Sequence, residues 1–419
     1  MNRKMNRRQF MGATSAAGGL LIIKPGLVRG TAANSAVRLG FLGCGARGTG
    51  VATAMVDNTN TRVVALADLF SDQLEKARKY FDDIAQKKGY AGIDPGLIFK
   101  GPKAFQEIAN CKEADAILIS TPDYFHAEHL EAVVEAGKHV YCEKPAGVDV
   151  VSCRKFMEIG KRAEGRLSLA VGFNVRWASQ FTELIRRVQA GAIGKIGIVS
   201  GFYHAPTISY PERSNASPVE RRIRNFYWDR VLSGDVIVDQ NIHIIDLCNW
   251  GVQAHPVKAV GTGGRNIRND ASDIWDHWTV SYTYPGDIHF NFNSAQFGES
   301  YWDVGIRFLG EAGMGEAYYR RVAQIVGKNP WQFKGPEAAQ TGSESGDFEG
   351  LSDADPNKAK SFIDSITSGT CLNEARMGAE SALSAILGRM ACYSGEEVTW
   401  DEMLGSNQSY QGAIDLSRL

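Results

Sequence analysis

The chain has 419 residues and a formal net charge of −1, from 46 basic and 47 acidic residues. This balance excludes a protein whose whole surface binds nucleic acid. Apolar residues make up 44% of the chain, which permits a large core and excludes wholesale disorder. At roughly 150 residues per domain, the length predicts two or three domains.

The first 36 residues contain six basic residues and no acidic one. Asn6 to Met11 (NRRQFM) is a twin-arginine pattern, and a mildly apolar stretch to Ile23 and small residues from Gly30 to Ala36 follow it. This order predicts a twin-arginine signal peptide over residues 1–36 and export to the periplasm. An uncleaved anchor is the alternative. No later window reaches the ~18 apolar residues of a transmembrane helix.

Residues 37–160 alternate short apolar runs with helical patterns. Strands are expected over 36–42, 62–67, 115–120 and 139–142, with helices between them. This alternation predicts an α/β fold that begins with a doubly wound parallel (Rossmann) sheet.

From about residue 165 the apolar runs alternate with polar residues and turns. Strands are expected over 196–203, 257–261, 278–284, 287–293 and 304–309. This pattern predicts a C-terminal α+β domain, residues 161–419, built on a largely antiparallel sheet. Helices are expected from residue 355 and over 373–390, and the C-terminal helix could pack back on the Rossmann domain.

A glycine-rich turn follows the first expected strand. Gly43, Gly45 and Gly48 form a G-x-G-x-x-G pattern between that strand and a helix. The first two glycines let the backbone approach a pyrophosphate, and the third lets helix and strand pack closely. Asp68 ends the second strand, where a carboxylate accepts hydrogen bonds from ribose hydroxyls and repels a 2′-phosphate. The cofactor expected is therefore NAD, with NADP disfavoured because no basic residue follows Asp68 closely.

Four more motifs follow in order: Thr121 to His126 (TPDYFH), Gly137 to Pro145 (GKHVYCEKP), Gly172 to Trp177 (GFNVRW) and Gly234 to His243 (GDVIVDQNIH). Together with the glycine turn, they resemble the glucose–fructose oxidoreductase/inositol dehydrogenase family, Gfo/Idh/MocA, over roughly residues 37–310. The resemblance implies an NAD(P)-dependent oxidoreductase that acts on CH–OH groups, with Lys144, Asp239 and His243 as the catalytic trio. It also implies a homodimer or homotetramer formed through the open face of the sheet.

The trio also makes chemical sense by itself. Asp239 and His243 are spaced i, i+4, so both are expected on one face of a helix, where the carboxylate would orient the imidazole and raise its basicity. His243 would act as the base, and Lys144 would polarise the substrate oxygen at the carboxyl edge of the sheet. Desolvation could lower the pKa of Lys144. Taken singly, Lys144 suits a surface turn and His243 a core histidine; together they favour catalysis.

Two further sets of residues are expected to surround the trio. The cofactor-binding set is Gly43, Gly45, Arg47, Gly48, Asp68, Thr121, Pro122, His126, Glu143 and Lys144. The substrate-binding set is Asn174, Arg176, Trp177, His204, Trp228 and His243, with packing roles as the alternative for several members. The arginine-rich segment 204–230 could lie over the cleft or form a solvated loop, and His277 is more easily explained by packing.

The leading functional hypothesis is an exported oxidoreductase that transfers a hydride between tightly held NAD and a secondary hydroxyl of a sugar, glycoside or polyol. A redox-assisted glycoside hydrolase and a non-catalytic sugar-binding protein are the alternatives. No metal site is expected, because the eight histidines are scattered. The seven cysteines, without a C-x-x-C pair, are expected to be mostly buried thiols.

Overall fold

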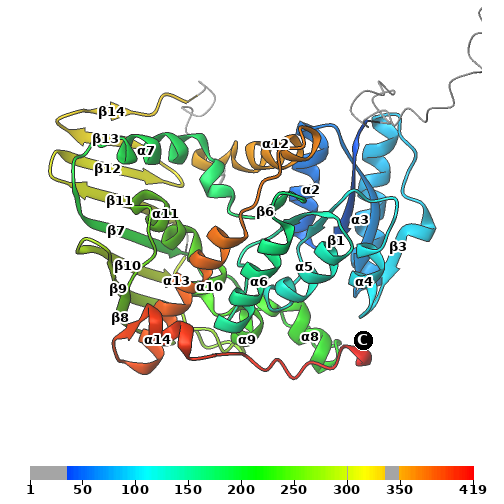
Figure 1. Cartoon of the computed structure of the whole chain (residues 1–419). Coiled ribbons are helices and arrows are strands. Elements are labelled where there is room, and N and C mark those ends of the chain that lie inside the picture. The colour runs from blue at the N-terminus through cyan, green and yellow to red at the C-terminus, as the bar shows by residue number, and fades with distance from the viewer. Residues whose placement is uncertain (1–34, 300, 336–348) are drawn as a thin grey trace, which may run out of the picture. The chain divides into compact units, whose positions relative to one another are not determined.

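The computed structural model describes residues 35–299, 301–335 and 349–419 (Figure 1). The expected signal peptide, residues 1–36, lies outside the described residues except for Ser35 and Ala36. Residues Val37–Leu419 form one compact unit. Across the described residues, we find no helix with the length and hydropathy of a membrane span.

A six-stranded sheet forms the N-terminal part of this unit, as predicted. Its order is β3-β2-β1-β4-β5-β6, and all of its pairs are parallel. The strand order reverses between β1 and β4, which opens a crevice at their carboxyl ends. The strands are β1 Val37–Leu42, β2 Thr61–Asp68, β3 Ile98–Lys100, β4 Ala116–Ile119, β5 His139–Cys142 and β6 Leu169–Val171.

Helices cover both faces of the first sheet. They keep β4 and most of β1 buried on both sides, which explains why these strands are continuous apolar runs in the sequence. The helices are α2 Ala46–Asn58, α3 Ser71–Lys87, α4 Ala104–Ala109, α5 His126–Glu135 and α6 Val150–Ala163. The expected boundary at residue 160 falls inside α6, and β6 completes the sheet beyond it.

A nine-stranded sheet follows, in the order β14-β13-β12-β11-β7-β10-β9-β8-β15. Among its described strands the β7–β10 pair is parallel and the other pairs are antiparallel, which confirms the predicted largely antiparallel sheet. The strands are β7 Ile196–Ala205, β8 Lys258–Gly264, β9 His277–Tyr284, β10 Ile288–Gln296, β11 Asp303–Gly310, β12 Gly313–Tyr318, β13 Gln324–Gly327, β14 Trp331–Gln332 and β15 Val398–Thr399.

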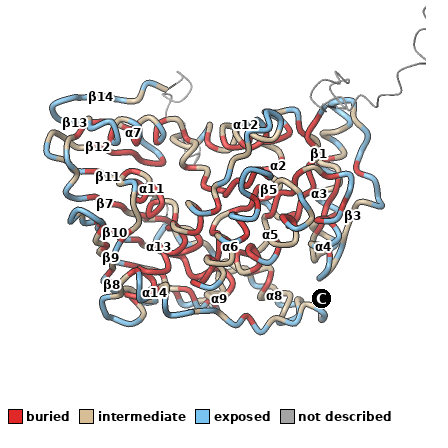
Figure 2. Tube along the Cα trace, viewed as in Figure 1, coloured by how far each residue is buried: buried red, intermediate tan, exposed pale blue. Residues whose placement is uncertain are grey.

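One face of this second sheet carries helices. They are α7 Ser179–Gln189, α11 Ile242–Val252 and α13 Ala375–Ser394 (Figure 1). Burial alternates along the strands: Phe290 and Phe292 of β10 are buried, whereas their neighbours are exposed. In Figure 2 the buried positions run along these helices and the strands beneath them, and the peripheral loops are exposed.

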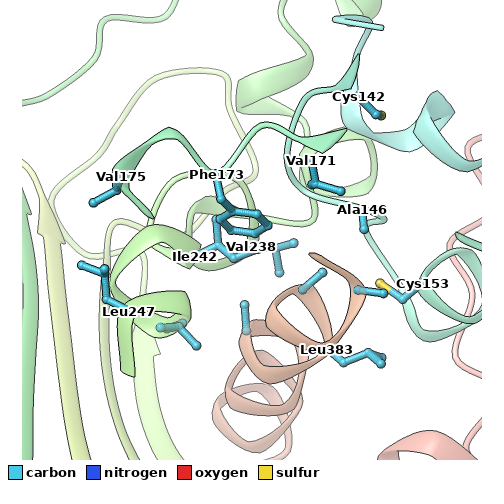
Figure 3. Close-up of a cluster of buried hydrophobic side chains, with 14 of the residues drawn as sticks. Cys142, Ala146, Cys153, Val171, Phe173, Val175, Val238, Ile242, Leu247 and Leu383 are labelled. Atoms are coloured by element: carbon cyan, nitrogen blue, oxygen red, sulfur yellow. The ribbon is translucent and has the colours of Figure 1, made fainter. Parts of the chain in front are cut away.

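One apolar core joins the two sheets. Phe173, Val238, Ile242 and Leu383 belong to it, and Figure 3 shows helix α13 approaching the segments that carry the other three. Helix α13 also packs against α6, and α12 (Ala354–Thr367) packs against α2. The C-terminal helices therefore lie against the helices of the first sheet, and this packing positions the crevice.

Candidate active site

The glycine turn has the shape of a phosphate cradle. Gly43 has a φ of +91°, and a Cβ there would lie 2.4 Å from the Ser120 carbonyl oxygen. A Cβ on Gly48 would lie 2.4 Å from the Phe41 ring. At Gly45 a Cβ would meet nothing within 4 Å. Gly43 and Gly48 therefore serve close packing, and Gly45 borders the open space beside the N-terminus of α2 that a pyrophosphate would occupy.

A cavity of about 190 Å³ adjoins this turn. Five of the predicted cofactor residues line it: Gly43, Gly45, Asp68, Thr121 and Pro122. Phe70, Phe105 and His129, which were not predicted, also line it. Arg213, Ile223, Arg224 and Phe226 line it as well, and they belong to the 204–230 segment that was expected either over the cleft or in a solvated loop. The polar side chains, the aromatic rings and the glycine turn that line this cavity fit the adenosine half of a dinucleotide.

Asp68 ends β2 at the rim of this cavity. Its Oδ2 accepts a hydrogen bond from the Cys44 backbone N–H at 2.7 Å, and its Oδ1 accepts one from the Phe70 N–H at 2.9 Å. Burial raises the pKa of Asp68, and these two hydrogen bonds partly oppose that rise. The Asp68 carboxylate therefore stabilises the glycine turn and also lines the cavity.

Arg224 reaches the same cavity from a distant part of the chain. It ends α8 (Pro218–Arg224), and its guanidinium pairs with Asp72 at 2.6 Å and lies 3.7 Å from the Phe70 ring centroid. Arg213 lines the cavity too. No basic residue follows Asp68 closely in the sequence, but the 204–230 segment brings two arginines to the same cavity.

Two histidines flank the strand end at Thr121. His126 is fully buried, and its ring nitrogens lie 2.7 Å from the Pro145 carbonyl oxygen and 2.9 Å from that of Thr121. It holds two loops together and does not line the cavity. His129 does line it, with Nδ1 2.9 Å from the Thr121 hydroxyl. Burial lowers the pKa of His129 to about 3.

Arg47 and Glu143, both predicted to bind the cofactor, bind each other. Arg47 Nε donates to Glu143 Oε1 at 2.9 Å, and the rest of its guanidinium is paired with Asp355. Burial raises the pKa of Glu143, an effect that Arg47 opposes. These contacts tie α2 to the loop after β5 and to α12.

Lys144 follows β5 and is largely buried, with 16% of its side chain exposed. Its Nζ donates to the Asp239 backbone oxygen at 2.5 Å and lies 3.4 Å from Asp239 Oδ1. Burial alone would lower the pKa of Lys144, yet the charges of Asp239, Asp123 and Glu143 outweigh it and raise the pKa. The expected fall in this pKa is therefore wrong, and the amine is a cation at neutral pH.

Asp239 and His243 do not share a continuous helix, contrary to the expectation. Asp239 ends α10 (Val236–Asp239), and His243 lies in the first turn of α11. The helical turn between them is wider than a regular α-helical turn, because the N–H groups of Gln240 and Asn241 both donate to the Val236 carbonyl. Asp239 consequently turns toward Lys144, and among the described contacts it makes no hydrogen bond to His243.

His243 keeps a free ring nitrogen. Its Nδ1 is shielded from solvent and has no hydrogen-bond partner in the described structure. Burial lowers the pKa of His243 well below its usual range, and the positive charges of Lys144 and Arg47 lower it further. A neutral imidazole with a free nitrogen therefore lies near a charged lysine.

A second carboxyl group, that of Asp123, was not among the predicted site residues, and the charges of Asp239 and Lys144 influence its pKa. It begins the short 3₁₀ turn Asp123–Phe125 after β4, and it is 3% exposed. The signal was present in the T-P-D motif, but nothing in the sequence showed that Asp123 would meet Asp239 and Lys144.

Several polar side chains lie near Asp239. The Gln296 amide donates to Tyr227 Oη and, at 2.6 Å, to Gln240 Oε1. Burial raises the pKa of Tyr203 and of Tyr227, and the charge of Asp239 adds to both rises. This group of hydroxyl and amide groups suits a polyhydroxylated ligand.

Strand alternation decides which way His204 points. Its neighbour Tyr203 is buried on the helix-covered face of β7, so His204 points to the opposite face. There its Nε2 lies 2.5 Å from Asn293 Oδ1. This contact places His204 on the opposite face of β7 from Tyr203, and its role in substrate binding stays a prediction.

Three predicted substrate residues lie in the turn Asn174–Trp177. Arg176 forms two 2.8 Å hydrogen bonds to Asp246 and borders a separate cavity of about 400 Å³ at the far end of α11. The Lys358 ammonium lies 5.0 Å from the Trp177 ring centroid. Asn174 is half-buried at the start of the turn. Arg176 and Trp177 are thus engaged in packing and ion pairing.

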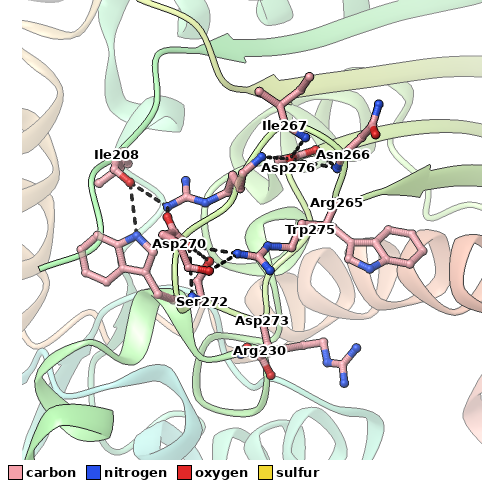
Figure 4. Close-up of polar contacts among 12 residues, drawn as sticks. Ile208, Arg230, Arg265, Asn266, Ile267, Asp270, Ser272, Asp273, Trp275 and Asp276 are labelled. Atoms are coloured by element: carbon pink, nitrogen blue, oxygen red, sulfur yellow. Dashed lines mark hydrogen bonds and ion pairs between the residues drawn. The ribbon is translucent and has the colours of Figure 1, made fainter. Parts of the chain in front are cut away.

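The last two candidate residues, Trp228 and His277, make their contacts away from Lys144, Asp239 and His243. Trp228 donates from Nε1 to the Ile208 carbonyl at 3.2 Å. His277 Nδ1 lies 2.7 Å from Asp276 Oδ1. Asp276 also accepts from the backbone N–H groups of Asn266 and Ile267 (Figure 4). Both residues therefore stabilise loops, the role that the sequence favoured for His277.

Comparisons with known proteins agree with this geometry. A family model described as "Oxidoreductase family, NAD-binding Rossmann fold" matches residues 37–172, and one described as "GFO/IDH/MocA C-terminal domain" matches residues 181–316. An inositol 2-dehydrogenase of Rhizobium meliloti (strain 1021) is 27% identical over 248 residues, which cover 58% of this chain and 64% of that protein.

Solved structures of low identity share the fold. Scyllo-inositol dehydrogenase from Lactobacillus casei, with bound NAD(H) and scyllo-inositol, has a TM-score of 0.65 at 18% identity and covers 87% of this chain and 99% of its own. Levoglucosan dehydrogenase, in complex with NADH and L-sorbose, has a TM-score of 0.68 at 16% identity, with coverages of 87% and 98%.

Proposed function

This chain belongs to the Gfo/Idh/MocA family of oxidoreductases, and on that premise we propose that it transfers a hydride between NAD and a secondary hydroxyl of a sugar, glycoside or polyol. The observation that carries the proposal is the neutral His243, whose Nδ1 is free, beside the charged Lys144. Removal of a hydride from an alcohol needs a base for the hydroxyl proton and a positive charge for its oxygen.

The chain's own residues divide this chemistry between them. Bound NAD would accept the hydride. His243 accepts the hydroxyl proton at a ring nitrogen, because its lowered pKa keeps the imidazole neutral at neutral pH. Lys144 uses part of its ammonium on Asp239 and can direct a remaining N–H at the substrate oxygen. Tyr227, Gln240 and Gln296 would hold the other hydroxyl groups.

The preference for NAD and its tight retention are parts of the same proposal. The Asp68 carboxylate faces the adenosine cavity, and the charge of Arg224 is already matched by Asp72 and Glu220. Ile223, Arg224 and Phe226, from the other half of the chain, line this cavity together with Phe70. These residues would cover the bound cofactor and slow its release.

Export and self-association complete the proposal. The twin-arginine pattern of residues 1–36 supports export by a route that carries folded proteins with their cofactor bound. The outer face of the nine-stranded sheet exposes Ile198 (44%), Val260 (42%), Leu309 (37%) and Val326 (51%). These apolar residues support a homo-oligomer formed through that face.

The test is nucleotide analysis of the purified full chain, followed by a screen of inositols and sugars for NADH formation. We expect bound NAD and activity on at least one polyol or sugar. His243→Asn should retain NAD and lose about 10²–10⁴-fold in kcat, whereas His277→Asn, outside the trio, should remain active. Absence of both nucleotide and NADH formation would refute the proposal, and release of sugar from an aryl glycoside without net NADH would replace it with hydrolysis.

A further inference from the structure

Residues 406–416 run from the second sheet to the cofactor cavity. Helix α14 (Trp400–Gly405) follows β15 of the nine-stranded sheet, and from its end the chain passes below α8 in Figure 1, where it is drawn in red. Leu416, at the far end of this segment, lines the cavity that Gly45 and Asp68 also line. The segment was not among the predicted cofactor residues, and it lies outside residues 37–172 and 181–316, which the family models match.

Hydrogen bonds tie the segment to the first half of the chain. The Tyr410 N–H donates to Asp149 Oδ2 at 2.6 Å, and the Gly412 N–H donates to Tyr124 Oη at 3.2 Å. The Tyr124 hydroxyl in turn donates to the Tyr410 carbonyl at 3.4 Å. Asp149 caps α6, and Tyr124 lies in the turn between β4 and α5. These contacts fix the path of the segment beside the carboxyl end of β4.

The carbonyl of Gly412 binds α8, which comes from the other half of the chain. It accepts a hydrogen bond from Arg222 Nη1, and the next two residues of α8, Ile223 and Arg224, line the cavity. Helix α8 has only seven residues, too few for a helix to be stable by itself, so it depends on such contacts. Gly412 therefore lies between Tyr124 and Arg222 and links the first sheet to the helix beside the cavity.

Leu416 adds an apolar group to the wall of the cavity. It is half-buried and begins the 3₁₀ turn Leu416–Arg418, where Asp415 Oδ1 accepts a hydrogen bond from the Ser417 N–H at 3.1 Å. The rings of Phe70, Phe105 and Phe226 line the same cavity. A planar base binds between apolar and aromatic groups of this kind, with a few polar groups that orient it.

We propose that residues 408–416 are part of the cofactor site, in which Leu416 packs on the adenine ring and the contacts at Gly412 hold α8 beside it. Leu416 is then a cofactor-binding residue. Tyr124 does not line the cavity, so it is a positioning residue that acts through the segment. The inference rests on the proposed function for the identity of the cofactor, and it assigns part of the cofactor's retention to a particular segment.

Calorimetric titration of the nucleotide-free full chain with NAD and with AMP tests the contact with adenine. We expect Leu416→Ser to weaken both affinities by the same factor, about five- to tenfold, because part of a leucine side chain loses its apolar contact. Leu419→Ser is the matched control, since Leu419 is 38% exposed and does not line the cavity. Unchanged AMP affinity in Leu416→Ser, or an equal loss in Leu419→Ser, would overturn the contact.

The rate of NAD dissociation tests the positioning role of Tyr124. Tyr124→Phe removes the hydroxyl that binds Tyr410 and Gly412, and we expect it to release NAD about three- to tenfold faster, the effect of one or two hydrogen bonds. Because Tyr124 acts through the segment, this effect should be smaller when Leu416→Ser is already present. Equal effects in the two backgrounds would overturn the positioning role.

These measurements separate the inference from the proposed function. If the wild type binds neither NAD nor AMP, the proposed function fails and the inference fails with it. If the wild type binds both and Leu416→Ser binds them equally well, the inference alone is overturned.

Discussion

At the scale of single residues, the site holds titratable groups whose pKa values depart from those of the free side chains. Lys144 stays charged because carboxyl groups surround it, and His243 stays neutral because burial and two cations oppose its protonation. Both residues were identifiable from sequence motifs. Asp123 and Tyr227 were not identified as site residues, since their roles depend on neighbours that are distant in the chain.

His129 makes the stability of the protein depend on pH. Its pKa is about 3 in the folded chain against 6.5 for an unperturbed histidine. Below pH 6.5 the unfolded chain binds a proton that the folded chain does not, so stability falls as the pH falls. We expect the free energy of unfolding of the wild type to decrease, relative to His129→Phe, by about 1.4 kcal/mol per pH unit below that point.

Urea unfolding of both proteins between pH 7.5 and 4.5 measures this difference. Phenylalanine keeps the ring beside Phe105 and Phe125, where His129 lies at 4.7 and 5.7 Å between centroids. A constant difference across the pH range would contradict the assignment of a neutral His129.

At the scale of elements, a turn and a helix break determine what the site can do. The glycine turn places Gly45 beside open space at the start of α2. The break between α10 and α11 directs Asp239 to Lys144 and leaves His243 free. The turn was predictable because its glycine spacing has a local cause. The break was not, because the i, i+4 spacing of Asp239 and His243 is compatible with an unbroken helix.

Gly45→Ala should separate cofactor binding from folding. The φ of Gly45 is −74°, which alanine can adopt, and the added Cβ would meet no protein atom. We expect an unchanged Tm and at least about a tenfold weaker affinity for NAD, because the methyl group would enter the phosphate space.

Gly50→Ala, on the exposed side of the same helix, is the matched control. It also adds a Cβ in open space, and it should raise stability by roughly 0.5–1 kcal/mol while leaving the affinity for NAD unchanged. Calorimetric titration with NAD checks both variants. Wild-type affinity in Gly45→Ala would show that the phosphates do not lie at this turn.

At the scale of the whole molecule, the two sheets are joined by one core, and the nine-stranded sheet keeps an exposed apolar face. Ile198 and Leu309 are paired across β7 and β11 on that face. Placing two charged groups there should dissociate an oligomer that buries this surface. We expect the double variant Ile198→Glu/Leu309→Glu to be a monomer by light scattering, and the wild type to be larger.

Ile267→Glu is the control for added charge. Ile267 is 56% exposed but lies in a loop outside the sheet, so this variant should keep the mass of the wild type. If the wild type is itself a monomer at micromolar concentration, the proposed interface does not exist.

The sequence by itself determined the features that have local causes. Strand periodicity predicted both sheets, and the spacing of the motifs predicted the family and Lys144, because these signals lie within single elements. The tertiary structure alone decided which side chains meet. It brought Arg224 to the cavity beside Asp68, placed His204 on the opposite face of β7 from Tyr203, and placed Asp123 where the charge of Asp239 influences its pKa. Such contacts, and the pKa values that burial produces, depend on long-range packing. A local sequence pattern does not predict that packing.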